Sequence, residues 1–121
     1  MIEGIGIDII ELQRIKELMT RQQKFIDRVL TPAEKDRYLT LSERRKVEYV
    51  AGRFAAKEAF SKAVGSGIGE RLSFHDIEIF SDKFGKPYIV KPFADGVHLS
   101  ISHSEQYAVA QVVIEKTKEK R

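Results

Sequence analysis

The spacing of apolar residues changes at the glycine-rich segment 65–69, and this change limits the fold more than any other feature. Before it, apolar residues recur every three or four positions, as in amphipathic helices. After it, apolar and polar residues alternate, as in strands with one buried face. Helices that precede strands predict an α+β fold with a mainly antiparallel sheet. Because no repeat or linker divides the 121 residues, we expect one domain, 1–121.

Local signals place the individual elements along the chain. The Ile-rich segment 2–10 predicts an N-terminal strand in which Gly4 and Gly6 let another backbone or a ligand come close. The other expected elements are helices at 12–30, 31–41 and 43–64, strands at 74–80, 87–90, 97–102 and 107–114, and a frayed tail at 116–121.

Three residues mark where these helices begin and end. Thr31, followed by proline and then by Glu34, predicts a capping box at a helix start. Ser42 can cap the long helix, although it lacks the reciprocal glutamate. Gly65 predicts the end of that helix in the left-handed conformation.

Composition narrows the kinds of site that the chain can carry. With 42% hydrophobic and 32% charged residues, the chain is expected to fold, and it contains no apolar run of membrane-spanning length. The first ten residues include Glu3 and Asp8 and no basic residue, so we expect no signal peptide, no membrane partner and a cytoplasmic location. Cysteine is absent and only three histidines occur, which favours an oxygen-bound hard cation such as Mg²⁺.

Two carboxylates occupy positions that the surrounding residues do not explain. Asp8 interrupts an apolar strand, where it must cap a helix, form an ion pair, bind a metal or lie at an exposed strand end. Glu58 follows Phe54 by four residues and so lies near the inward-facing stripe of its helix, but its spacing from Lys62 also fits a surface salt bridge.

These carboxylates belong to a pair of motifs that resembles a known family. Residues 54–63 (FAAKEAFSKA), together with Gly6-Ile7-Asp8, are similar to the paired signatures of 4′-phosphopantetheinyl transferases. The short chain, segment 85–87 (GKP) and segment 100–103 (SISH) resemble the small holo-acyl-carrier-protein synthase branch. Phenylalanine at position 54, where the larger branch tends to have tryptophan, also favours the small branch.

The resemblance implies transfer of 4′-phosphopantetheine from coenzyme A to a serine of an apo-acyl carrier protein. Adenosine 3′,5′-bisphosphate would be released, and the reaction would support fatty acid biosynthesis. Asp8 and Glu58 are then expected to bind Mg²⁺ at the pyrophosphate, and Lys62 is expected to act there as a point charge. The base that accepts the serine proton is either Glu58 or a metal-bound water.

Other residues are expected to contact the coenzyme. Arg53 and Lys57 are candidates for its nucleotide phosphates. The resemblance adds segment 85–87 (Gly85, Lys86 and Pro87) and His103, which could contact the 3′-phosphate. On residue type alone, His103 reads as an ordinary loop histidine.

A basic stripe on the first helix gives a candidate docking surface. Apolar side chains lie inside a basic rim on the helical wheel, an arrangement that suits an acidic partner. The residues concerned are Arg14, Leu18, Arg21, Lys24, Phe25 and Arg28. Such a stripe is usually no more than a solvent-exposed charged face, but the resemblance implies a docking surface for acyl carrier protein.

The resemblance also implies a homotrimer with active sites between subunits. A nucleic-acid-binding module is the main alternative, given the net charge of +3 and the basic stripe. It fits poorly, because the strands lack an interleaved aromatic surface and Asp8 would have no role. We therefore expect no nucleic-acid partner. A non-catalytic scaffold is the third interpretation, and it would leave both carboxylates without a shared purpose.

Overall fold

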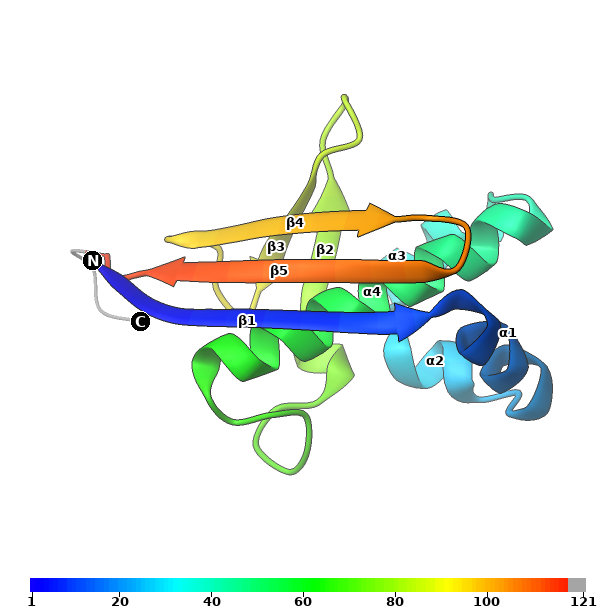
Figure 1. Cartoon of the computed structure of the whole chain (residues 1–121), viewed down its shortest axis with the longest axis horizontal. Coiled ribbons are helices and arrows are strands. Elements are labelled where there is room, and N and C mark those ends of the chain that lie inside the picture. Colours follow the sequence, from blue (N-terminus) through cyan, green and yellow to red (C-terminus); the bar gives the residue numbers. More distant parts are fainter. Residues whose placement is uncertain (118–121) are drawn as a thin grey trace.

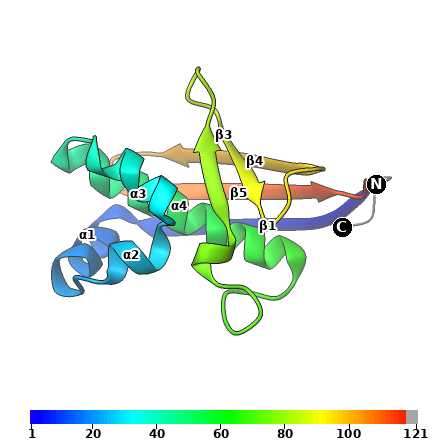
Figure 2. The ribbon, with the colours of Figure 1, turned by 180° about the vertical axis from the view of Figure 1, so that it is seen from behind.

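A three-stranded antiparallel sheet carries a long helix on one face, in agreement with the predicted α+β fold. The structure, a computed structural model, describes residues 1–117. The strand order is β1-β5-β4, with β1 at Ile2–Glu11, β5 at Tyr107–Glu115 and β4 at Val97–His103. Helix α4 spans Glu43–Val64 and lies across the sheet. Figure 1 looks onto the open face of the sheet, and Figure 2 shows the helices and a hairpin on the other face.

The strands predicted at 74–80 and 87–90 form a hairpin, but they make a separate two-stranded sheet that the sequence did not predict. Strands β2 (Glu78–Ser81) and β3 (Pro87–Lys91) pair with each other, and the tip of their hairpin projects beyond the three-stranded sheet (Figure 1). The strand predicted from residue 74 begins later, because Phe74–Asp76 form a 3₁₀ turn. In that turn the Asp76 carboxylate accepts a hydrogen bond from the Ser73 amide at 2.8 Å.

The helix predicted over 12–30 is two helices, so that prediction was wrong. Helix α1 spans Leu12–Arg21 and α2 spans Phe25–Val29, with Gln22 extended between them. In one unbroken helix, Phe25 would lie about 80° from Ile15 around the axis. Because the chain breaks at Gln22, Phe25 and Val29 can both turn into the core.

The predicted capping box and helix stop are confirmed. At the start of α3 (Pro32–Leu39), Thr31 Oγ1 accepts the Glu34 amide at 3.3 Å, and Glu34 Oε1 accepts the Thr31 amide at 2.8 Å. Gly65 ends α4 in the left-handed region, with φ of 90°. Ser42 precedes α4, but its side chain forms no capping hydrogen bond, so the prediction that it caps this helix was wrong.

A buried ion pair joins α4 to the smaller elements. Lys57 Nζ lies 2.6 Å from Glu34 Oε1 and also donates to the backbone carbonyl groups of Val29 and Phe74. The second carboxylate oxygen of Glu34 accepts the Ile79 amide at 2.9 Å. Because both charges are fully buried, removal of either partner alone would leave an uncompensated charge in the core.

Strand β1 and helix α4 approach each other at backbone distance. A Cβ atom on Gly6 would lie 1.8 Å from the Ala59 carbonyl oxygen, and one on Gly4 would lie 2.0 Å from the Ala63 carbonyl oxygen. Glycine is therefore required at both strand positions where the two elements cross. This explains both glycines of the predicted strand through the approach of another backbone.

The C-terminal segment is held against the start of the chain. The Lys116 amide donates to the Met1 carbonyl at 2.8 Å, so the first residue of the predicted tail is tied to β1. The rest of that tail, from 118 onward, lies outside the described residues.

Within residues 1–117, none of the helices combines the length and the apolar character needed to cross a bilayer.

The close approach predicts a large cost for a single methyl group. Gly6→Ala should lower the free energy of unfolding by at least about 2 kcal/mol, because the new Cβ atom meets backbone that cannot move aside. Gly69→Ala is the matched control, because a Cβ atom there meets nothing within 4 Å, and it should change stability by less than about 0.5 kcal/mol. Urea unfolding of both variants measures the difference. Equal midpoints would contradict the packing described above.

Candidate active site

Asp8 faces α4 from the middle of β1 and pairs with Lys62. Lys62 Nζ lies 3.1 Å from Asp8 Oδ1 and donates to the Ile7 carbonyl at 3.0 Å. Only 17% of the Asp8 side chain is exposed. Asp8 follows Gly6 by two residues on the strand, so its side chain points to the same face as Gly6 and toward α4.

Glu58 lies in the same cluster and is electrostatically coupled to Asp8. Burial raises the pKa of the Glu58 carboxyl, the charge of Asp8 raises it further, and Lys62 partly lowers it. Like charges held close together disfavour the ionised form, so a cation between them would relieve the repulsion.

Two structural interpretations of these residues can now be set aside. Asp8 does not cap α1, because the capping position is Glu11 and no side chain caps that helix. Lys62 forms its ion pair with Asp8 rather than with Glu58, so the surface salt bridge between Glu58 and Lys62 is absent. The cluster contains Asp8 from β1 and both Glu58 and Lys62 from α4.

The donor set suits a hard cation that also binds a ligand. Mg²⁺ often uses one or two carboxylates and obtains its other ligands from phosphate oxygens and water. Asp8 and Glu58 provide that number of carboxylates. Within residues 1–117 no group of three or more metal-ligating side chains occurs, so a dedicated all-protein metal cage is not present in that part of the chain.

A separate cavity of about 840 Å³ contains most of the predicted coenzyme contacts. It lies between α4, α3 and the β2–β3 hairpin, and its lining includes Arg53, Gly85, Pro87 and His103. Lys86, between two of these residues, does not line it. Sequence reasoning missed further lining residues, among them three cations and one aromatic residue: Arg37, Arg45, Lys83 and Tyr49.

One signal for the missed residues was present in the sequence. Tyr49 precedes Arg53 by four residues, so the two side chains share one face of α4. The Arg53 guanidinium lies over the Tyr49 ring, with Cζ 4.2 Å from the ring centroid. Arg37 and Arg45 looked like ordinary surface charges, because only the fold brings α3 and the hairpin to the same cavity.

Lys57 does not lie in this cavity, contrary to its predicted role at the nucleotide phosphates. Its side chain is fully buried, and its ammonium group is taken up by Glu34 and two carbonyl groups. Its pKa is lowered by burial, with Glu34 opposing that shift. Lys57 therefore stabilises the core, whereas its neighbour Glu58 faces β1.

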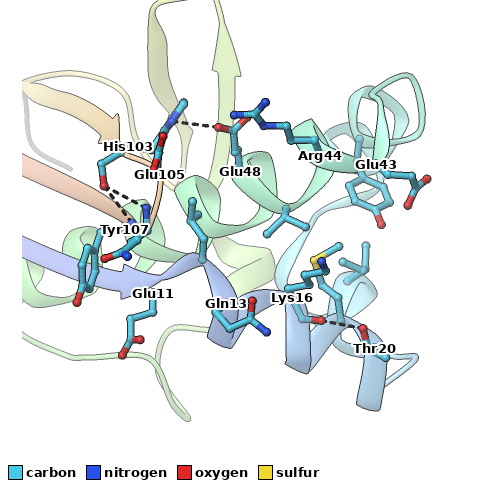
Figure 3. Close-up of a pocket in the computed structure, with 17 residues that line it drawn as sticks. Glu11, Gln13, Lys16, Thr20, Glu43, Arg44, Glu48, His103, Glu105 and Tyr107 are labelled. Carbon is cyan, nitrogen blue, oxygen red and sulfur yellow. Dashed lines mark hydrogen bonds and ion pairs between the residues drawn. The ribbon is translucent and has the colours of Figure 1, made fainter.

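His103 lies where two cavities meet. Its Nδ1 atom is 3.3 Å from Glu48 Oε2, and both residues line the cavity of about 840 Å³ and a second one of about 1260 Å³. Figure 3 shows the second cavity, between α1, α4 and the turn that joins β4 to β5. Four glutamates line it: Glu11, Glu43, Glu48 and Glu105. Of the predicted site residues only His103 reaches it, and its four glutamates outnumber its two cations, Lys16 and Arg44, which makes it less suited to phosphates than the other cavity.

The predicted docking residues are divided between two helices. Arg14 and Arg21 are exposed on α1, Lys24 and Arg28 are exposed beyond the break, and Leu18 is half-buried. Phe25 is buried, and its ring centroid lies 6.1 Å from that of Phe54. The prediction of Phe25 as a projecting apolar anchor was therefore wrong, because its side chain packs α2 against the core.

The carboxylate cluster and the cationic cavity lie at opposite edges of the three-stranded sheet. Asp8 belongs to edge strand β1, whereas the cavity is lined by β4 and by the hairpin that packs against β4. Strand β5 separates the two edges. None of Asp8, Glu58 and Lys62 lines the cavity, so the two sets of predicted site residues lie apart within one chain.

Known proteins with similar sequences and folds point to one family. The sequence profile of the 4′-phosphopantetheinyl transferase superfamily matches residues 4–112. A holo-[acyl-carrier-protein] synthase of Anoxybacillus flavithermus is 65% identical and matches 96% of this chain and 98% of its own. Another, of Bacillus subtilis, is 59% identical over the same shares.

A solved structure agrees with these relatives. The crystal structure of a holo-(acyl-carrier-protein) synthase from Bacillus anthracis in complex with CoA (3′,5′-ADP) superposes with a TM-score of 0.88. It is 54% identical and covers 97% of this chain and 99% of its own. The chain therefore belongs to the 4′-phosphopantetheinyl transferase superfamily, as an enzyme of its small holo-[acyl-carrier-protein] synthase type.

Proposed function

We propose that this chain transfers 4′-phosphopantetheine from coenzyme A to a serine hydroxyl of apo-acyl carrier protein. The products are holo-acyl carrier protein and adenosine 3′,5′-bisphosphate, and we assign the reaction to fatty acid biosynthesis in the cytoplasm. The observation that carries the proposal is the convergence of Asp8, Glu58 and Lys62, the residues of both family motifs, at one crossing of β1 and α4. Close relatives that bear the same enzyme name support it.

Asp8 and Glu58 are the proposed ligands of Mg²⁺. Bound there, the cation would neutralise charge that develops on the pyrophosphate leaving group. Side chains of this protein would take part in phosphate binding and proton transfer. Lys62, half-exposed beside Asp8, can turn toward a phosphate oxygen as a point charge. The serine proton would pass either to the Glu58 carboxylate or to a water bound to the cation.

The cationic cavity is the proposed site for the nucleotide part of coenzyme A. Arg53 and His103 line it from α4 and β4, and Gly85 and Pro87 line it from the hairpin. Arg37, Arg45 and Lys83 add positive charge suited to phosphates. We extend the contact to Lys86, which lies between Gly85 and Pro87.

We further propose a homotrimer in which each active site combines surfaces of two subunits. The separation of the carboxylate cluster from the cavity supports this arrangement, because one coenzyme molecule must reach both. The open face of the sheet also supports it: Ile5, Ile7 and Ile9 are 58%, 57% and 62% exposed on one strand. Val109 and Val113 lie opposite Ile9 and Ile5 on β5, which widens the apolar patch. Such a patch favours burial against another chain.

The basic surface of α1 and α2 is the proposed docking site for the carrier protein. Arg14, Arg21, Lys24 and Arg28 are exposed there, with Leu18 half-buried among them. Complementary charge increases the association rate with an acidic partner and orients it. Because α1 directly follows β1, a partner on this surface is held near the end of the strand that carries Asp8.

An intact-mass assay tests the proposed reaction. Apo-acyl carrier protein incubated with coenzyme A, Mg²⁺ and the enzyme should gain the mass of phosphopantetheine. Asp8→Asn and Glu58→Gln should each slow this gain at least about 100-fold, because each removes a ligand oxygen from the metal. Glu70→Gln, which alters an exposed loop carboxylate, is the matched control and should react normally.

Thermal unfolding shows whether the two variants remain folded. Glu58→Gln should keep or raise the melting temperature at neutral pH, because burial and Asp8 both penalise the charged form of Glu58. No mass gain with several carrier proteins would refute the function. Near-normal Mg²⁺-dependent turnover by either variant would refute the metal assignment alone.

Charge reversal tests the docking surface. Arg14→Glu should weaken carrier-protein binding about fivefold or more at low salt and reduce its salt dependence, while coenzyme A binding persists. Lys116→Glu is the matched control, because Lys116 follows the end of β5 that lies far from α1. Surface plasmon resonance at several salt concentrations gives both quantities. Equal losses in the two variants would count against docking on α1.

A further inference from the structure

Arg53 is a half-buried cation in the wall of the cationic cavity. Its terminal nitrogen donates to Ser81 Oγ at 3.2 Å, and its Nε atom is buried without a hydrogen-bond partner. Within residues 1–117, no carboxylate lies within ion-pair distance of its guanidinium. Burial lowers the pKa of Arg53. A half-buried guanidinium without a carboxylate partner can bind an anion that enters the cavity.

Tyr49 supplies the surface on which this guanidinium lies. Arg53 Cζ is 4.2 Å from the centroid of the Tyr49 ring, within the range of a cation–π contact. The Tyr49 hydroxyl donates to the Glu34 carbonyl at 3.0 Å, and burial raises its pKa. The ring is therefore fixed at both ends, by the helix that carries it and by α3.

The residue that fixes Tyr49 is itself fixed by the core. The Glu34 carboxylate accepts hydrogen bonds from Lys57 Nζ and from the amides of Thr31 and Ile79. These contacts join α4, the start of α3 and β2. A rigid series of contacts thus runs from the buried ion pair through Tyr49 to Arg53 at the cavity.

The charge around the cavity indicates what Arg53 is held for. Arg37, Arg45 and Lys83 also line it. Its three carboxylates have partners within the chain: Glu34 binds Lys57, Glu48 binds His103, and Asp82 accepts amides of the hairpin turn. Several cations around one cavity of about 840 Å³ suit a ligand with more than one phosphate.

We propose that Tyr49 is the positioning residue that holds Arg53 for the nucleotide phosphates of coenzyme A. The inference rests on the proposed function, and it assigns to Tyr49 a role in binding rather than in the transfer step. Loss of the ring should therefore raise KM for coenzyme A and leave kcat almost unchanged, because the carboxylate cluster lies at the opposite edge of the sheet from Tyr49.

Substitutions at Tyr49 separate its ring from its hydroxyl group. Tyr49→Met keeps apolar volume but removes the ring, and should weaken the binding of adenosine 3′,5′-bisphosphate about tenfold. Tyr49→Leu should act in the same direction. Tyr49→Phe keeps the ring and should bind within about threefold of the wild type. Isothermal titration calorimetry with the bisphosphate measures all four proteins, and thermal unfolding confirms that each is folded.

A double-mutant cycle tests whether Tyr49 acts through Arg53. Arg53→Ala should weaken binding at least about tenfold, and adding Tyr49→Met to it should weaken binding little further. Tyr38→Leu is the matched control, because Tyr38 also lies under a cation, Lys46, at 5.2 Å, but lines the other cavity. It should leave bisphosphate affinity unchanged.

Different outcomes contradict different parts of the account. If Tyr49→Met weakens binding by the same factor with and without Arg53, or if Tyr38→Leu has the same effect, the positioning role is refuted. If Arg53→Ala binds the bisphosphate as the wild type does, the cavity assignment fails with it. If binding follows the prediction but no mass gain occurs in the carrier-protein assay, the proposed function fails while the role of Tyr49 in nucleotide binding stands.

Discussion

The backbone contact between β1 and α4 is the constraint on which the rest of the structure depends. A strand and a helix can approach this closely only where Gly6 and Gly4 face the carbonyl groups of Ala59 and Ala63. The same contact sets how far along α4 the strand lies, and so places Asp8 beside Lys62 and near Glu58. Packing of small residues thus creates the proposed metal site, because the carboxylates come from elements about fifty residues apart in the sequence.

Adjacent charges on α4 serve opposite sides of the helix. Lys57 points into the core, where Glu34 neutralises it, whereas Glu58 points toward β1. A buried pair costs desolvation, but its hydrogen bonds connect α4 with α3 and β2 and fix their relative positions. Those elements also form the cavity around Arg53. The fold therefore supports the two proposed halves of the site through different residues of one helical turn.

The sequence predicts the parts of this structure that depend on local signals. The capping box at Thr31, the stop at Gly65 and the change from helices to strands are confirmed because short-range chemistry determines them. The break at Gln22 was missed, because Ile26 continues the apolar stripe of α1 and only the burial of Phe25 requires a turn. The role of Lys57 was predicted wrongly and Tyr49 was missed, because the partner of both residues, Glu34, comes from another helix. The metal ligands came from the motif resemblance, since spacing alone left structural alternatives open.

The most direct test of the convergence of Asp8 and Glu58 is the titration of Glu58 by carbon-detected NMR without metal. In the wild type, the Glu58 carboxyl should titrate above the ordinary range of glutamate, because burial and the charge of Asp8 both disfavour its ionised form. In Asp8→Asn, its pKa should fall, because the repulsive charge is gone and Lys62 loses its competing partner. A Glu58 carboxyl that titrates in the ordinary range, with no response to Asp8→Asn, would contradict the shared site.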